Sequence, residues 1–257
     1  MSNLGRLIPL DWKHVEKYPF SALSPLPVGT VEKVLMLPSW QWSHNQGSTG
    51  SCVGHGVSME RAITNTRQNI LAHLPWPRVR RYNPLFVWNE AKKIDEWSDT
   101  NPGDNNGTSV RAGYDVARTR GLARVRGMRL DSFDHPYSVR ERAVDINEGI
   151  LATRWAVSVD EIRSAIYDGI PVTIGINWYE EFDHPYRLGR DWFLPKPLDL
   201  GSIRGGHCVV LYGASDERQA FKLKNSWGKA YPLVWLPYVV MERLLNEQAE
   251  AALVTDK

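Results

Sequence analysis

The glycine- and serine-rich run at residues 45–56 constrains this chain more than any other feature, because it leads into a cysteine. Small and turn-forming residues let the backbone bend sharply just before Cys52. No proline then follows until Pro75, so the pattern predicts a helix from Cys52 to about Ile70.

The thiol of Cys52 would lie at the positive end of the helix dipole, beside backbone N–H groups that have no partner within the helix. Both favour the thiolate, the nucleophilic form of cysteine, so we expect a lowered thiol pKa. Gly54 and Gly56 weaken a helix, which is understandable if another element packs closely on its first turns. The competing interpretation is a small, buried and inert cysteine.

The composition indicates a globular protein with a substantial core, since 42% of the 257 residues are hydrophobic and 23% are charged. A net charge of +2 gives no reason to expect a nucleic-acid partner. The two cysteines argue against a disulfide framework and fit a reducing compartment.

The chain shows no signal for export or for a membrane. Residues 1–10 are interrupted by glycine, arginine and proline, so they lack the apolar core of a signal peptide. No run of about 18 apolar residues occurs, so we expect no membrane contact. A cytoplasmic or virion-associated location is the expectation.

The order of helical and strand patterns predicts an α+β protein. Residues 1–38 are rich in proline and aromatics and predict an N-terminal arm or a short pro-segment, which we expect to cross or flank the active-site cleft and limit access. The remaining residues, 39–257, would form the catalytic domain. A helical lobe at about 45–155 would precede a sheet lobe at about 156–257, with a cleft between the two lobes.

Capping and turn signals place the individual elements. Asn83-Pro84 predicts a helix to about Trp97, Thr108 or Ser109 caps one that Gly121 ends, and Ser158 with Glu161 forms a capping box. Strands are predicted at about 171–178, 207–212, 221–225 and 234–236, and a helix at about 237–248 precedes an apolar tail.

A cysteine nucleophile needs a base and a group that orients the base. His207 follows two glycines at the start of one predicted strand, and Asn225 ends the next strand. Antiparallel pairing can bring the Asn225 carbonyl oxygen to one ring nitrogen of His207. That contact fixes the tautomer and directs the other nitrogen towards Cys52.

At these residues the sequence resembles the papain family of cysteine peptidases. The matching segments, in the family's order, are Gln46 with Gly50-Ser51-Cys52, Gly206-His207, and Lys224-Asn225-Ser226-Trp227-Gly228. Further similarity to the short bacterial and phage or viral branch lies in residues 83–86, 107–111, 168–172 and 235–238.

The resemblance implies a papain-like two-lobe fold and an endopeptidase that hydrolyses peptide bonds through an acyl-thioenzyme, with no metal or cofactor. Cys52 would be the nucleophile, His207 the base and Asn225 the residue that orients the base. Gln46 would contribute to the oxyanion hole. The substrate, a peptide or protein, would bind along Gly107, Thr108, Gly205, Gly206 and Trp227, with Trp227 covering the Asn–His contact.

Several readings stay open beside this one. Val53 and residues 229–233 depart from the family pattern, so a papain-fold structural or binding protein of a phage particle, with little turnover, is the main alternative. An unrelated Cys-His-Asn amidase acting on cell-wall peptides is a third. His55 lies one helical turn beyond Cys52 and is a rival base, although nothing nearby in the sequence would orient it. We expect Cys208 to be a buried apolar residue on the strand face opposite His207.

Overall fold

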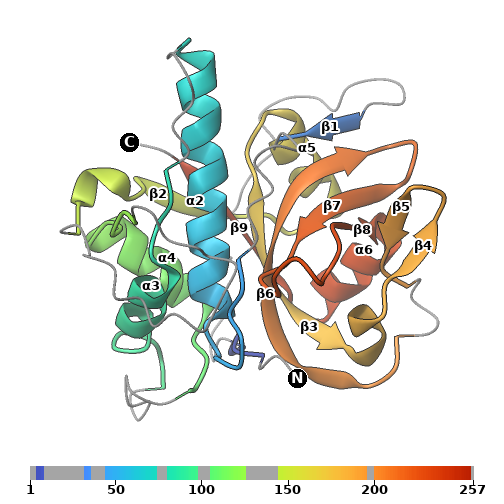
Figure 1. Ribbon diagram of the computed structural model, residues 1–257, viewed down its shortest axis with the longest axis horizontal. Coiled ribbons are helices and arrows are strands. Elements are labelled where there is room, and N and C mark those ends of the chain that lie inside the picture. The colour runs from blue at the N-terminus through green and yellow to red at the C-terminus, as the bar shows by residue number, and fades with distance from the viewer. Residues whose placement is uncertain are drawn as a thin grey trace.

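The computed structural model describes residues 4–8, 32–35, 44–73, 80–97, 105–125, 144–195 and 200–255. The described chain forms a helical part and a sheet part that face each other across helix α2 (Figure 1). The five α-helices among these residues are α2 (Cys52–Leu71), α3 (Pro84–Ala91), α4 (Val110–Thr119), α5 (Val159–Tyr167) and α6 (Tyr238–Asn246).

The helix starts agree with the sequence signals. Asn83 caps α3, because its side-chain oxygen accepts from the backbone N–H groups of Leu85 and Phe86. Ser109 caps α4 and Ser158 caps α5 in the same way. The end of α3 differs from the expectation: the helix stops at Ala91, not near Trp97.

Asp95 accounts for this early end. Its Oδ1 accepts from the backbone N–H of Trp97, and its Oδ2 accepts from the Thr108 hydroxyl at 2.7 Å. A side chain used in this way favours a turn over a continued helix.

The sheet is largely antiparallel, with strand order β2-β9-β3-β6-β7-β8-β5-β4 and β1 paired to β6. Its strands are β1 (Glu32–Val34), β2 (Ala152–Trp155), β3 (Val172–Tyr179), β4 (Tyr186–Leu188), β5 (Asp191–Phe193), β6 (Ile203–Ser215), β7 (Ala220–Lys224), β8 (Val234–Pro237) and β9 (Glu250–Thr255). Short 3₁₀ turns, η2 (Ile146–Glu148) and η3 (Glu180–Asp183), connect some of these elements.

The apolar tail expected after α6 forms a strand that the sequence did not predict, because residues 250–255 make up β9, between β2 and β3. This strand pairs with neighbours on both sides and its side chains at 250–254 are buried. A strand that is buried on both faces is apolar along its length. It therefore lacks the alternation of apolar and polar residues by which strands are usually predicted from sequence.

Close packing of α2 joins the two parts of the molecule. A Cβ on Gly54 would lie 2.0 Å from the Pro84 carbonyl oxygen of α3, and one on Gly56 would lie 2.6 Å from the Cys208 sulfur of β6. The first turns of α2 therefore lie directly between α3 and the sheet, as expected from these glycines. Within the described residues, no helix has the length and apolar character needed to cross a membrane.

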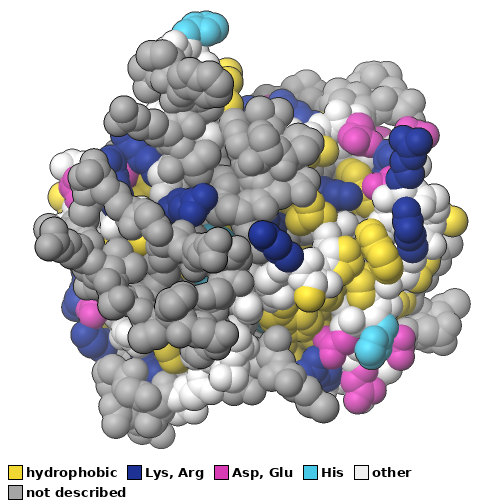
Figure 2. All heavy atoms as spheres, in the orientation of Figure 1, with side chains coloured by type: hydrophobic (Ala, Val, Ile, Leu, Met, Phe, Trp, Pro, Cys, Tyr) yellow, Lys and Arg dark blue, Asp and Glu magenta, His cyan; other side chains and the backbone are white. Residues whose placement is uncertain are grey.

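On the face shown in Figure 2, hydrophobic side chains gather over the sheet part, and basic side chains lie beside them. The β4–β5 hairpin exposes Tyr186, Leu188 and Trp192.

We predict that Asn83→Ala lowers the free energy of unfolding by about 1–2 kcal/mol, because two backbone N–H groups lose their acceptor at a buried helix start. Urea unfolding followed by tryptophan fluorescence measures the change. The matched control, Asn147→Ala at an exposed site, should stay within about 0.5 kcal/mol of the parent. Equal effects of the two substitutions would contradict the capping role.

Candidate active site

Cys52 is the first residue of α2 and is fully buried. Its sulfur lies against the backbone N–H groups of Gly5, Cys208 and Val53, all of which favour the thiolate. Cys208 directly follows His207 in β6. The start of α2 therefore faces the strand that carries the histidine.

His207 and Asn225 are in direct contact. The Nε2 of His207 is 2.8 Å from the Oδ1 of Asn225, and the backbone N–H of Ser226 also donates to that oxygen at 2.7 Å. A carbonyl oxygen only accepts, so the neutral ring must carry its hydrogen on Nε2. The Nδ1 atom then has a bare lone pair, and it has no hydrogen-bond partner in the described part of the chain. Cys52 is thus not hydrogen-bonded to His207 in this arrangement.

Aromatic side chains enclose the His207 ring. Trp227 stacks on it at a centroid distance of 5.0 Å, and Trp178 contacts it edge-on at 4.8 Å. Tyr231 packs edge-on against Trp227 at 5.2 Å and donates to the Phe182 carbonyl. Tyr231 belongs to the segment at 229–233 that departs from the family pattern, and it supports the Trp227 ring that stacks on His207.

Gln46 is tied to the same region by its neighbours. Its backbone N–H donates to the Ser226 carbonyl at 2.8 Å, and its Oε1 accepts from the Ser226 hydroxyl at 2.6 Å. Its Nε2 donates to the Thr49 carbonyl at 2.8 Å. These bonds hold Gln46 beside the segment that carries Asn225 and Ser226.

Residues 4–8 of the N-terminal segment lie between the two walls that the sequence assigned to substrate. Thr108 donates its backbone N–H to the Gly5 carbonyl at 2.8 Å and accepts from the Leu7 N–H at 2.9 Å. On the other wall, the Arg6 N–H donates to the Gly206 carbonyl at 3.0 Å. These five residues therefore contact both predicted walls. That residues 1–38 cross or flank the cleft and limit access stays a prediction, and most of the other residues of that stretch lie outside the described ranges.

The glycines of both walls make this approach possible. A Cβ on Gly107 would lie 1.8 Å from the Gly5 carbonyl oxygen, and one on Gly206 would lie 2.1 Å from the Arg6 carbonyl oxygen. Gly205, with φ of 152°, lies against the side chain of Leu4. Four of the five predicted substrate-binding residues thus contact the N-terminal segment, and Trp227 makes none of these bonds or close approaches.

The expected lowering of the Cys52 pKa was wrong for this arrangement. Burial raises the pKa of the thiol to about 11, against the smaller opposing effects of the three backbone N–H groups and of the Arg6 charge. The physical reason is the desolvation of the thiolate, to which the segment at 4–8 contributes by covering the sulfur. Burial also lowers the pKa of His207 to about 4, while its bond to Asn225 opposes the shift. Both groups are uncharged at neutral pH.

His55 has an orienting partner after all, which corrects the expectation from the sequence. Its Nδ1 is 2.9 Å from the Nδ1 of His44, and both rings are buried. Burial lowers the pKa of His55 to about 3 and that of His44 well below its ordinary value. His55 therefore belongs to a buried pair, not to the base position beside Asn225. Cys208 is buried and unbonded to the other cysteine, as expected.

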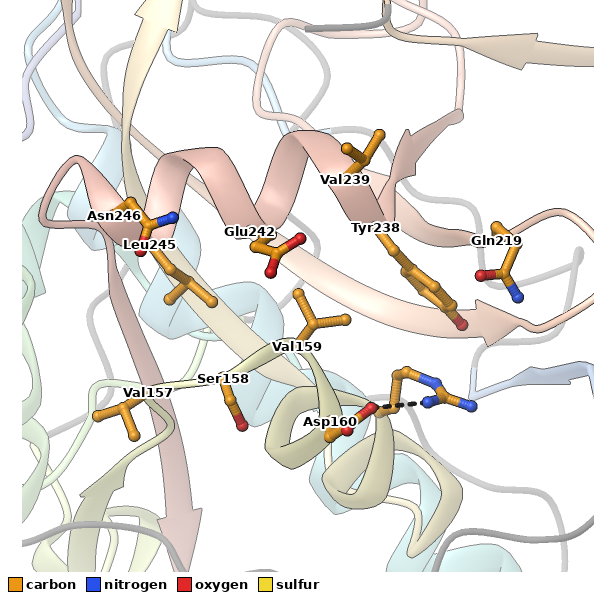
Figure 3. A pocket seen from close by; sticks show the side chains of 11 residues that line it. Val157, Ser158, Val159, Asp160, Gln219, Tyr238, Val239, Glu242, Leu245 and Asn246 are labelled. Atoms are coloured by element: carbon orange, nitrogen blue, oxygen red, sulfur yellow. Dashed lines mark hydrogen bonds and ion pairs between the residues drawn. The ribbon is translucent and has the colours of Figure 1, made fainter.

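Two of the pockets formed by described residues lie beyond the contacts with residues 4–8. One of about 550 Å³ adjoins the site and is lined by Asn225, Gly228 and Tyr231 together with basic side chains. The other, of about 500 Å³, lies between the start of α5 and helix α6, with Val159, Tyr238 and Glu242 in its lining (Figure 3). This second pocket contains none of the candidate catalytic residues. Among the described residues, no cluster of His, Cys, Asp or Glu has the arrangement of a metal site.

The proteins that this chain resembles include solved cysteine proteases and one relative described as peptidase C1-like. No protein-family model matches the chain. It is 21% identical to an uncharacterized peptidase C1-like protein of Acanthamoeba polyphaga mimivirus in an alignment of length 247, which covers 88% of this chain and 74% of that protein.

Solved structures give a broader match. Xylellain, a cysteine protease from Xylella fastidiosa, superposes with a TM-score of 0.72 at 18% identity, covering 100% of this chain and 97% of that one. Procathepsin B from Trypanosoma congolense gives a TM-score of 0.64 at 11% identity, over 98% of this chain and 87% of that one. The fold is that of the papain-like cysteine proteases.

We predict that Arg6→Ala speeds alkylation of Cys52 by iodoacetamide at pH 7 by about tenfold or more. The substitution removes the buried ion pair that holds residues 4–8 over the sulfur, and each unit by which the thiol pKa falls raises the thiolate fraction about tenfold. Labelling rates measured between pH 6 and 11 should show a lower midpoint in the variant. Arg187→Ala, which removes an equally charged but exposed residue, should leave the rate unchanged. An unaltered midpoint in Arg6→Ala would contradict the covering role.

We predict that the fold loses stability as the pH falls from about 6.5 to 4, because three buried histidines, His44, His55 and His207, have lowered pKa values. In the unfolded chain a histidine takes up its proton near pH 6.5, so their contribution is complete above that value and is lost below it. Thermal unfolding at a series of pH values measures this slope. His55→Gln should flatten it, whereas His73→Gln, at an exposed site, should not. Equal slopes in both variants would refute the assignment.

Proposed function

We propose that this protein is a papain-like cysteine endopeptidase that cleaves peptide bonds through an acyl-thioenzyme. The observation that carries the proposal is the bond from His207 Nε2 to Asn225 Oδ1, which leaves the Nδ1 lone pair as a base on the strand that faces Cys52. The papain-like fold and the peptidase C1-like relative support it.

The reaction begins when a substrate displaces the N-terminal segment. The Nδ1 of His207 accepts the thiol proton of Cys52, and the sulfur attacks the substrate carbonyl carbon. A C–S bond forms, and the negative oxygen is stabilised by backbone N–H groups at the start of α2 and by the Gln46 amide. The C–N bond then breaks as His207 returns its proton to the leaving amine. Water, deprotonated by His207, hydrolyses the thioester and frees Cys52.

The remaining site residues hold the base and the substrate. Asn225 fixes the ring through both steps, and Trp227 stacks over the ring and keeps water away from the contact. Thr108 and Gly206 offer backbone groups to an extended substrate, as they do to residues 5–7. The absence of side chains at Gly107 and Gly205 leaves room for the substrate backbone.

We also propose that residues 1–38 act as an inhibitory arm or pro-segment ahead of a catalytic domain at 39–257. In the arm-bound state both the thiol and the imidazole are neutral and covered. Displacement of the arm returns water to the site, which removes much of the desolvation that raises the thiol pKa. The thiolate–imidazolium pair can then form.

A papain-fold structural or binding protein, for example one assembled into a phage particle, is less well supported. It would have no need for the His207–Asn225 contact beneath Trp227 or for a cysteine at the start of α2. A cell-wall amidase has no specific observation in its favour. The reducing location expected from the cysteine content fits either a cytoplasmic or a virion-borne peptidase.

We predict that Cys52→Ala and His207→Ala each reduce kcat/KM for peptide cleavage by at least about 10³-fold, and that Gln46→Ala reduces it by about 10²–10³-fold. Cleavage of a peptide library, read by mass spectrometry, measures the loss. An epoxide inhibitor of papain-like peptidases should modify Cys52 in the parent and fail to do so in His207→Ala. The control Cys208→Ala removes the other thiol and should retain the modification. Cleavage that persists in Cys52→Ala would exclude the proposal.

A further inference from the structure

The side chain of Arg6 fills a buried pocket beside the candidate active site. Its Nε and Nη2 atoms donate to the same carboxylate oxygen, Glu250 Oε2, at 3.2 and 3.1 Å. Nη2 also donates to the Gln248 carbonyl at 3.1 Å. Both charged side chains are fully shielded from solvent. The pocket thus offers a carboxylate and a carbonyl to one forked cation.

The pocket is built from elements far from the N-terminus. Glu250 begins β9, where it pairs with Gly175 of β3. A Cβ on Gly175 would lie 2.8 Å from Arg6 Nε, 3.2 Å from Glu250 Oε2 and 2.7 Å from Val110 Cγ2. The missing side chain at Gly175 therefore provides the space in which the guanidinium lies.

The backbone contacts of Arg6 and its neighbours place the pocket close to Cys52 and His207. Its N–H is bonded to Gly206, the residue before His207, and its two neighbours are bonded to Thr108. The backbone N–H of Gly5, the residue before Arg6, lies against the Cys52 sulfur. A side chain in the pocket consequently belongs to a residue held next to the reacting thiol.

We propose that this pocket is a specificity site, in which Glu250 selects substrates with a basic side chain, arginine above lysine, within two residues of the cleaved bond. This inference rests on the peptidase function proposed above. A buried carboxylate loses its hydration and favours a cation over an apolar or acidic side chain. The planar guanidinium matches the paired bonds to Oε2 and the additional bond to Gln248, which an ammonium group cannot reproduce. Arg6 occupies the site as an internal mimic of such a substrate.

The first test compares peptides that differ in a single group. Cleavage sites in a peptide library should be enriched in arginine, then lysine, at one position within two residues of the cut. A peptide with arginine at that position should have a kcat/KM about 30-fold or more above that of the same peptide with citrulline, which has nearly the same shape and no charge. Equal rates for the two peptides would overturn the inference and show that the ion pair serves only to anchor the arm.

Two matched variants assign the selectivity to Glu250. In Glu250→Gln the ratio of arginine to citrulline rates should fall towards one. In Glu217→Gln, which removes the same charge from the exposed β6–β7 turn, the ratio should stay at the parent value. A ratio that persists in Glu250→Gln would overturn the assignment. The peptide comparison in the parent protein holds even if Glu250→Gln folds poorly.

A second readout does not depend on turnover. In full-length Arg6→Ala, the peptide acetyl-Leu-Gly-Arg-Leu-amide should slow iodoacetamide labelling of Cys52. The same peptide with citrulline in place of arginine should need about a 30-fold higher concentration to slow labelling equally. Protection by the arginine peptide without any cleavage would refute the peptidase function and leave the pocket assigned. Equal protection by both peptides would refute the pocket, whether or not cleavage occurs.

Discussion

The close contact of the first turns of α2 with β6 is the constraint on which the rest of the site depends. Gly56 lets the helix approach the Cys208 side chain, and Gly54 lets α3 lie against the opposite side. A Cβ at Gly56 would push the helix start away from the strand, and one at Gly54 would push it away from α3. This contact places Cys52 in the same region as the strand residue His207, although more than half of the chain separates them in sequence. Two residues that lower helix propensity thereby fix the geometry of the candidate nucleophile and base.

Much of the fold follows from local signals in the sequence. Asn83, Ser109 and Ser158 cap helices, as their side chains indicate. The strand that carries His207 forms as expected, but it begins at Ile203 and so includes the two glycines that were expected to precede it. The order of helices before strands gave the fold class correctly. Asn225 reaches His207 because two consecutive strands, β6 and β7, pair in antiparallel register, which is a local and therefore predictable relation.

What the sequence could not reveal arises from contacts between distant segments. Arg6 and Glu250 meet only because β9 lies beside β3 in the completed sheet, and His44 meets His55 only once the loop before α2 has folded back. The thiol pKa moved in the opposite direction from the expectation for the same reason. A helix start favours the thiolate, but the local pattern contains no sign that residues 4–8 will cover the sulfur. Of the 11 tryptophans, nothing local distinguished Trp178 as a neighbour of His207.

The ion pair between Arg6 and Glu250 spans 244 positions, and this separation orders events during synthesis. The ribosome makes Glu250 after every helix and nearly every strand of the described fold. Until then, backbone bonds to Thr108 and Gly206 can hold the N-terminal segment, but the pocket for its arginine lacks the Glu250 carboxylate. The ion pair that fixes the N-terminal segment over the site therefore forms late in synthesis. A nascent chain passes through a stage in which α2 and Cys52 are present but the Arg6–Glu250 ion pair has not yet formed.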